Sequence, residues 1–158
     1  MSLLVVSISS IAYTPQALSA GRTISQVPSS GSSVELVVVH TPVLGSKHLD
    51  NPHSGATGWG TPAPRMIFNG GDPSGRVTSI RWHRWGRRFA LGFGRTYVFR
   101  PKGGYYGRMV EAELRPSDLG RCSAHGPLAY RHLVAREPSK PGGPLGKWFG
   151  WAGWPSIC

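Results

Sequence analysis

Alternating apolar and polar positions mark the second half of the chain as strand-forming. The clearest case runs from Arg108 to Arg115, where every second residue is apolar. A period of two is typical of a strand with one buried face. We therefore expect two distinct faces, with Val110, Ala112 and Leu114 inward and Glu111 and Glu113 outward.

Residues 77–85 and 128–135 carry the same strand pattern. In the first segment strict alternation predicts two faces, Ile80 and Trp82 against Val77, Ser79, Arg81 and His83. In the second it predicts Tyr130, His132 and Val134 against Ala129, Arg131 and Leu133. Residues 89–93 and 97–99 are further strand candidates, and Gly92 and Gly94 suit a close approach of neighbouring strands.

The first half of the chain is less regular. Val34–Val39 is rich in β-branched residues and predicts a strand, whereas residues 40–64 are dense in Gly, Pro, Asn, Thr and His. We therefore predict a signal peptide (1–20), a flexible or irregular N-terminal segment (21–64) and a β domain (65–158). About five to seven short strands joined by turns predict an all-β fold, a small antiparallel β-sandwich or partly open barrel with one disulfide.

Composition supports a fold without long helices. Gly (22) and Pro (14) exceed a fifth of the 158 residues, and each costs about 1 and 3 kcal/mol inside a helix. Two cysteines occur, Cys122 and the final residue, Cys158. We expect them to form a disulfide that ties down the end of the chain, the alternative being two free thiols. Their spacing fits no zinc motif, and we predict no cofactor.

Met1–Ala20 has the features of a signal peptide except one. The apolar run Leu3–Tyr13 is followed by small residues suited to peptidase cleavage, but no Lys or Arg precedes Arg22. Either the start lies upstream or the segment is not a signal. We expect an exported, extracellular protein. The apolar runs are too short to predict a membrane span, and we expect a monomer.

Several spaced motifs in the last ninety or so residues resemble a family of small, uncharacterised secreted proteins from actinobacteria, which the chain matches at residues 72–86, Gly92-Phe93-Gly94, Leu119-Gly120-Arg121-Cys122, Ala129-Tyr130 and Trp154-Pro155-Ser156-Ile157-Cys158. The resemblance implies export, a β domain rich in Trp and Gly, and a disulfide. It implies no activity.

The formal net charge of +11 directs attention to anionic partners. Nine Arg and one Lys against two Glu lie between residues 76 and 115, so most of the excess is concentrated there. Arginines beside tryptophans suit phosphate contact combined with base stacking. The alternative is a solvated strand face with the Trp rings inside and the Arg heads outside. The predicted ligand-binding residues are Arg81, Arg84, Arg87, Arg88 and Arg95.

Two other motifs admit a functional and a simpler interpretation. The aromatic run 148–154 suits a stacking platform for sugars or an interfacial anchor, or it folds back to cover the core. His48, Asp50 and His53 offer metal-ligand types within six residues, but without a scaffold to hold them.

Catalysis finds little support in the sequence. Glu111 or Glu113, His125 or His132, and Arg81 or Arg131 supply the residue types of a secreted ribonuclease. Only the types match, because none of the local motifs of such nucleases is present. We therefore expect a non-enzymatic binder of anionic extracellular or envelope polymers, or of nucleic acid. The alternatives are a ribonuclease-like toxin using Glu111 and His132, and a structural module in which the charge is incidental.

Overall fold

The computed structural model describes residues 40–151, 153 and 155–158, and in this part nearly all regular structure is β-strand. The expected signal segment and the expected strand at residues 34–39 lie outside it. Two 3-10 turns are present, η1 (Lys47–Leu49) and η2 (Pro73–Gly75). The strands are β1 (Val43–Leu44), β2 (Ile67–Phe68), β3 (Arg76–His83), β4 (Leu91–Thr96), β5 (Val110–Arg121), β6 (Leu128–Arg136) and β7 (Phe149–Gly150).

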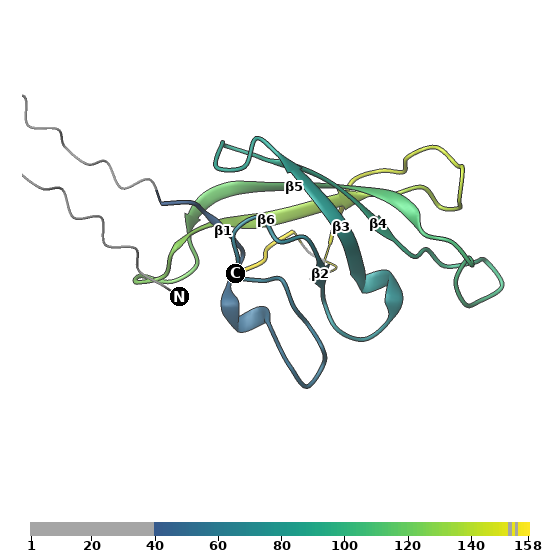
Figure 1. The fold of residues 1–158 in the computed structure, drawn as a ribbon, viewed down its shortest axis with the longest axis horizontal. Helices are drawn as coiled ribbons and strands as arrows, with labels where there is room; N and C mark the ends of the chain where they lie inside the picture. The colour runs from purple at the N-terminus through teal and green to yellow at the C-terminus, as the bar shows by residue number, and fades with distance from the viewer. Residues whose placement is uncertain (1–39, 152, 154) are drawn as a thin grey trace, which may run out of the picture. The chain divides into compact units, whose positions relative to one another are not determined.

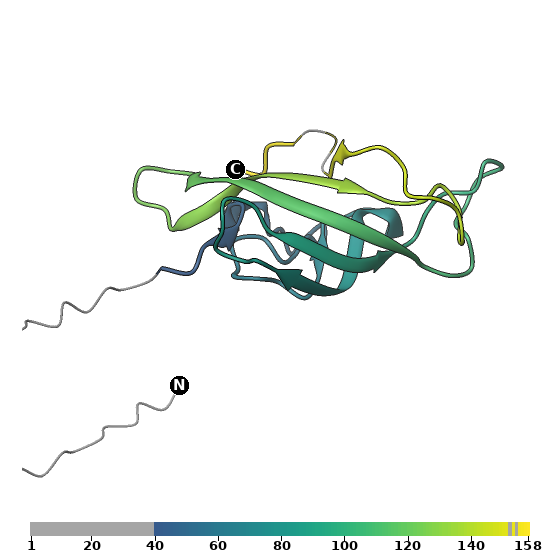
Figure 2. The ribbon, with the colours of Figure 1, turned by 90° about the horizontal axis from the view of Figure 1, so that it is seen from above.

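These strands form one curled sheet rather than two stacked ones. Its order is β1-β6-β5-β4-β3-β2, with β7 also paired to β6. All pairings are antiparallel except that of β1 with β6, which is parallel. Figures 1 and 2 show β2–β4 curling beneath the long strands β5 and β6. The result is a half-barrel, so the all-β prediction is confirmed in its partly open barrel form.

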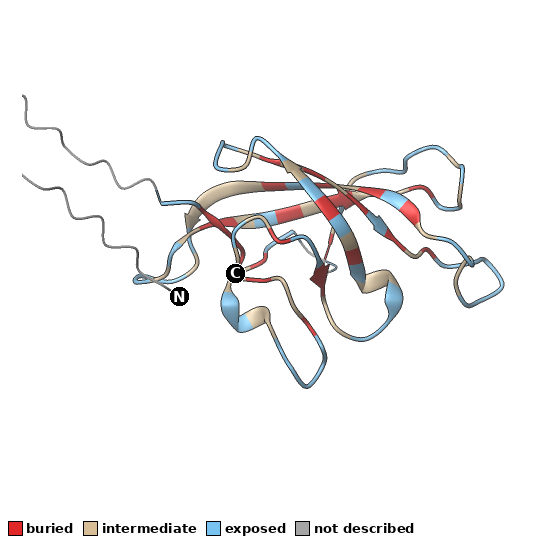
Figure 3. Ribbon diagram, in the orientation of Figure 1, coloured by how far each residue is buried: buried red, intermediate tan, exposed pale blue. Residues whose placement is uncertain are grey.

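The core fills the inside of the curl, and its buried positions follow the strands in Figure 3. On β5 the alternation is as predicted, because Val110, Ala112 and Leu114 are buried while Glu111 is exposed and Glu113 half-buried. Burying such a face is the main favourable contribution to folding, at about 25 cal/mol per Å² of apolar surface.

Strand β3 departs from the predicted alternation. Val77 and Ile80 are both buried in the same core, although strict alternation puts them on opposite faces. The register with β4 shifts between Thr78 and Arg81, and Ser79 adopts a φ of 54°. A bulge of this kind inserts one extra residue and reverses the faces beyond it.

Gly92 and Gly94 on β4 allow the close strand approach that the sequence predicts. A Cβ on Gly92 would lie 2.5 Å from the Trp82 ring, and a Cβ on Gly94 would lie 2.5 Å from a Val77 methyl carbon. The core side chains of β3 therefore lie directly over the backbone of β4. Residues 91–96 form one strand through both glycines, instead of two strands broken by them.

Strand β6 is also only partly regular. Leu133 is buried and His132 is exposed, as alternation predicts, but Tyr130 is fully buried although it shares the parity of His132. Beside it on β5, Asp118 takes a φ of 60°. The register of β5 with β6 is nevertheless the same on both sides of Asp118, so no bulge accounts for the break in the pattern.

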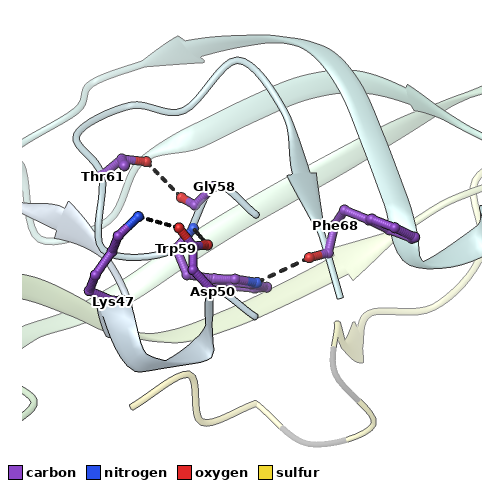
Figure 4. A network of polar contacts seen from close by, with 6 residues as sticks. All are labelled: Lys47, Asp50, Gly58, Trp59, Thr61 and Phe68. Carbon is purple, nitrogen blue, oxygen red and sulfur yellow. Dashed lines mark hydrogen bonds and ion pairs between the residues drawn. The ribbon is translucent and has the colours of Figure 1, made fainter. Parts of the chain in front are cut away.

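The packed unit begins before Arg65, the predicted boundary. Residues 40–64 contain little regular structure, but Leu44 and Trp59 from this segment belong to the core. Trp59 is fixed from two sides: its backbone N–H donates to Asp50 Oδ1 (3.0 Å) and its Nε1 donates to the Phe68 carbonyl (3.3 Å) (Figure 4). Lys47 pairs with the same Asp50 carboxylate.

Two tryptophans of the basic block hold this segment against the sheet. Trp82 Nε1 donates to the Pro64 carbonyl (2.7 Å), and Trp85 Nε1 donates to the Pro42 carbonyl (2.9 Å). Their rings contact each other edge to face, with centroids 4.8 Å apart. A large ring with one polar atom is well suited to this combination of packing and anchoring.

The end of the chain returns to β6 and is fixed by the predicted disulfide. Cys122 and Cys158 are bonded, closing a loop with a sequence separation of 36 residues. Within it, Trp151 and Ile157 are 6% and 2% exposed, so the tail covers the core as one of the two interpretations predicts. No helix within residues 40–151 or the described tail is long and apolar enough to cross a membrane.

Candidate anion-binding face

Three arginines surround an open hollow on the outer side of the sheet, the side facing away from the core. Arg81 on β3 is paired with Phe93 on β4, and Arg95 follows two positions later on the same face. Diagonal neighbours of this kind lie about 7–8 Å apart. With Arg108 and Glu111 they line the outer hollow, a space of about 800 Å³ walled on one side by Pro138–Gly143.

None of the three arginines has a carboxylate within salt-bridge distance. In the described part of the chain the lysine and arginine ion pairs are Lys47–Asp50, Arg131–Asp118 and Arg136–Glu113. Glu111 lies opposite Arg95 in the strand register, but their side chains do not form an ion pair. Three guanidinium groups against the single carboxylate of Glu111 leave the outer hollow with a net positive charge, and its field attracts anions.

The remaining predicted ligand-binding residues form a separate group. Arg84, Arg87 and Arg88 are exposed and lie in the turn between β3 and β4. The Tyr130 hydroxyl fixes this turn, accepting from Gly86 N–H (2.9 Å) and donating to the Arg87 carbonyl (2.7 Å). The structure therefore brings Arg81 and Arg95 together and carries the other three beyond the end of β3.

The tryptophans of the basic block do not share this surface with the arginines. Trp82 and Trp85 pack against the core, whereas Arg81 and Arg84 are exposed. Of the two sequence interpretations, the structure matches the one that places rings inside and guanidinium groups outside. The two tryptophans that were expected to stack on bases instead bind the backbone of Pro64 and Pro42.

A different tryptophan lies on the outer side, outside the block that sequence analysis singled out. The guanidinium groups of Arg115 and Arg136 each lie 4.7 Å from the ring centroid of Trp148. Arg136 also binds Glu113, its register partner on β5, at 2.6 Å. Together with the outer hollow, this cluster extends a basic surface across β3 to β6; we call it the arginine face.

The histidine motif does not assemble a metal site. No group of three metal-ligand side chains is found within the described residues. Asp50 is occupied by Lys47 and by the Trp59 backbone, and His48 bonds to the Ser46 hydroxyl (2.6 Å).

The strand register separates Glu111 from His132, the pair considered for ribonuclease chemistry. His132 is opposite Ser117, six residues along β5 from Glu111. At about 3.3 Å per residue the two backbone positions are about 20 Å apart, too far for both side chains to act on one phosphate. His132 instead lies 3.8 Å from Asp118, and the bond from Arg131 lowers the pKa of that carboxyl.

Comparisons with known proteins return no family model, no curated protein sequence and no solved structure that matches this chain. The resemblance to secreted actinobacterial proteins therefore stays a prediction. Function is argued below from the chain's own geometry.

Proposed function

We propose that the protein is exported and that its arginine face binds an anionic polymer of the extracellular space or cell envelope. The observation that carries this proposal is the outer hollow, where Arg81, Arg95 and Arg108 converge without an ion-pair partner in the described structure. Guanidinium groups bind phosphates and carboxylates through two parallel hydrogen bonds.

The spread of the charges favours a polymer over a single small anion. Arg84, Arg87 and Arg88 form a second exposed group in the turn beyond β3, and Arg115 lies on β5. A chain of repeated anions contacts several such groups at once and releases a counterion at each.

The placement of the aromatic rings favours recognition of the charged backbone over recognition of bases. Trp82 and Trp85 are packed inside, and the Trp148 ring is already covered by two guanidinium groups. Base stacking needs an open ring face. The disulfide supports export, because such bonds persist in oxidising compartments.

The test compares binding of the full chain to polyphosphate, polyglutamate and oligothymidylate of equal charge across a salt series. For Arg81→Gln/Arg95→Gln we expect at least about tenfold weaker binding and a salt slope smaller by about one to two. The matched control is Arg65→Gln/Lys102→Gln, which removes the same charge from exposed positions away from the outer hollow.

Equal losses in the two double variants would show that binding follows net charge alone and would remove the outer hollow as a site. Binding of oligothymidylate more than tenfold tighter than polyphosphate would instead point to base recognition. Thermal melting of each variant checks that the fold is intact.

A further inference from the structure

A second hollow lies where the end of the chain meets the turn after β2, and its lining differs from that of the arginine face. It measures about 340 Å³ and is lined chiefly by Asn69, Asp72, Phe99, Glu137, Phe149 and Trp151. Asn69 Nδ2 donates to the Trp151 carbonyl at 3.3 Å, joining the turn to the tail. We call this site the tail hollow.

Two aromatic rings at the tail hollow remain in contact with water. Phe99 is 55% exposed and Phe149 is 41% exposed, and they are two of the four large apolar side chains exposed to this degree in the described structure. The other two, Met66 and Leu145, lie outside this hollow. Exposed apolar surface gathered at one hollow is characteristic of a binding site.

Three side chains that line the same hollow each contain a buried polar atom without a hydrogen-bond partner in the described structure. Glu137 Oε2, Asn69 Oδ1 and Trp151 Nε1 are buried and unpaired within the described structure, where only one other side-chain atom, Arg131 Nε, shares this condition. Leaving a buried polar atom unpaired costs about 1–3 kcal/mol. Because all three side chains line one hollow, a molecule bound there can supply the missing bonds.

The chemistry of these atoms selects the class of ligand. Asn69 Oδ1 needs a donor and Trp151 Nε1 needs an acceptor, whereas the Glu137 carboxyl accepts when ionised and can also donate when protonated. An ammonium group only donates and cannot serve Trp151 Nε1, and a phosphate would bring its negative charge against Asp72 and Glu137. A hydroxyl group both donates and accepts, so a polyhydroxylated ligand can satisfy all three atoms.

We propose that the tail hollow binds an uncharged sugar residue, whose hydroxyl groups bond to Glu137, Asn69 and Trp151 and whose apolar ring face packs on Phe99 or Phe149. No lysine, arginine or histidine is among the described residues that line the hollow, although the chain is strongly basic. Burial without a counter-charge also raises the pKa of Glu137 to about 7. This site is independent of the arginine face.

The experiment titrates the full chain with uncharged tetrasaccharides of β-1,4-linked glucose, N-acetylglucosamine or mannose and of α-1,4-linked glucose. Tetramethylammonium and inorganic phosphate serve as comparison probes. Binding is followed by calorimetry and by the NMR signal of the Trp151 indole N–H. We expect at least one tetrasaccharide to bind and to shift that signal.

Phe99→Ala/Phe149→Ala removes the two exposed rings, and we expect it to weaken sugar binding by at least about tenfold. Met66→Ala/Leu145→Ala is the matched control, because it removes the other two exposed apolar side chains, and it should bind as the wild type does. Arg81→Gln/Arg95→Gln should also retain sugar binding, which separates this site from the proposed polymer site.

The proposal is overturned if none of the tetrasaccharides shifts the Trp151 signal, or if both phenylalanine and control variants lose binding equally. Tighter binding of tetramethylammonium than of every sugar would also overturn it, in favour of a cation site built from the same carboxylates and rings.

Discussion

The arginine face lies on neighbouring strands, β3 to β6, which are paired along their length. The tail hollow instead lies where short segments from four parts of the chain meet. On the first, Arg81, Arg95 and Arg108 surround one carboxylate, Glu111. The second has two carboxylates, Asp72 and Glu137, and no basic side chain among its described lining residues. The outer hollow therefore has an excess of positive charge, whereas the lining of the tail hollow contains only acidic charged groups.

This separation has a different physical basis in each region. On the strands, exposed guanidinium groups remain solvated, so their proximity costs little and is screened by salt. In the tail hollow, Glu137 is shielded from water, and its charge is disfavoured enough to raise its pKa. The arginines on the strands are therefore exposed to solvent, whereas polar atoms of the side chains at the tail hollow are buried.

The largest effect expected to separate the two regions follows from removing the disulfide. Cys122→Ser/Cys158→Ser should lower the free energy of unfolding by about 3–4 kcal/mol, because the unfolded chain is no longer constrained by the closed loop. Urea unfolding measures this loss. Amide exchange should rise most at residues 149–157 and least at β4, which lies outside the loop.

Equal increases in exchange along the whole sheet would contradict this separation. They would mean that the tail hollow and the arginine face open as one cooperative unit.

A smaller effect should appear in the pH dependence of stability. Folded Glu137 holds its proton up to about pH 7, whereas the unfolded chain releases it near 4.5. The folded state then binds more protons between these values, so the free energy of unfolding falls as pH rises through this window and levels off above it. Because the group is only partly buried, we expect a decline of about 1–2 kcal/mol.

Glu137→Gln should remove this decline, as measured by urea unfolding at pH 4.5, 6 and 8. Glu111→Gln takes a carboxylate from the arginine face instead and should keep it. The lowered pKa of Asp118 acts in the opposite sense, since its stabilising effect is lost as pH falls through its folded pKa. An unchanged pH profile in Glu137→Gln would show that this residue is not the source.

The smallest effect concerns the arginines of the β3–β4 turn. Tyr130→Phe removes the hydroxyl that bonds to Gly86 and Arg87, and it should cost about 1 kcal/mol of stability without changing the charge. If the turn arginines contribute to polymer binding only when the turn is held in place, the variant should bind polyphosphate more weakly, by less than about threefold. Sugar binding should be unchanged. Tyr97→Phe is the control, and equal polyphosphate binding in both variants would show that fixing the turn is irrelevant.

Local signals in the sequence were enough to predict the regular part of the fold. The alternation of β5, the glycines of β4 and the pairing of Cys122 with Cys158 each follow from residues close to the feature they produce. The bulge at Ser79 does not, because a polar residue with a positive φ has no distinct local pattern. One undetected bulge reversed the predicted face of Val77 relative to Ile80.

The rest depends on contacts between distant residues. Trp59 stands alone in a segment rich in Gly and Pro, and its burial depends on partners such as Phe68 that pattern analysis does not connect to it. The tail hollow likewise combines single residues from Asn69 to Trp151. Of the five arginines predicted to bind a ligand, the register unites two and adds Arg108, which only the bulk charge of the block had marked.

The outer border of β6 is closed by three separate pieces of chain: β1 beside Ala129 and Tyr130, residues 155–157 beside 131–133, and β7 beside Val134 and Ala135. Each piece is only two or three residues long, so a second copy finds no continuous ladder to extend. The disulfide at Cys158 holds one of these pieces, residues 155–157, against β6. Reduction would therefore be expected to loosen this piece first and to expose the backbone of residues 131–133, which is the kind of unpaired strand edge that another chain can join.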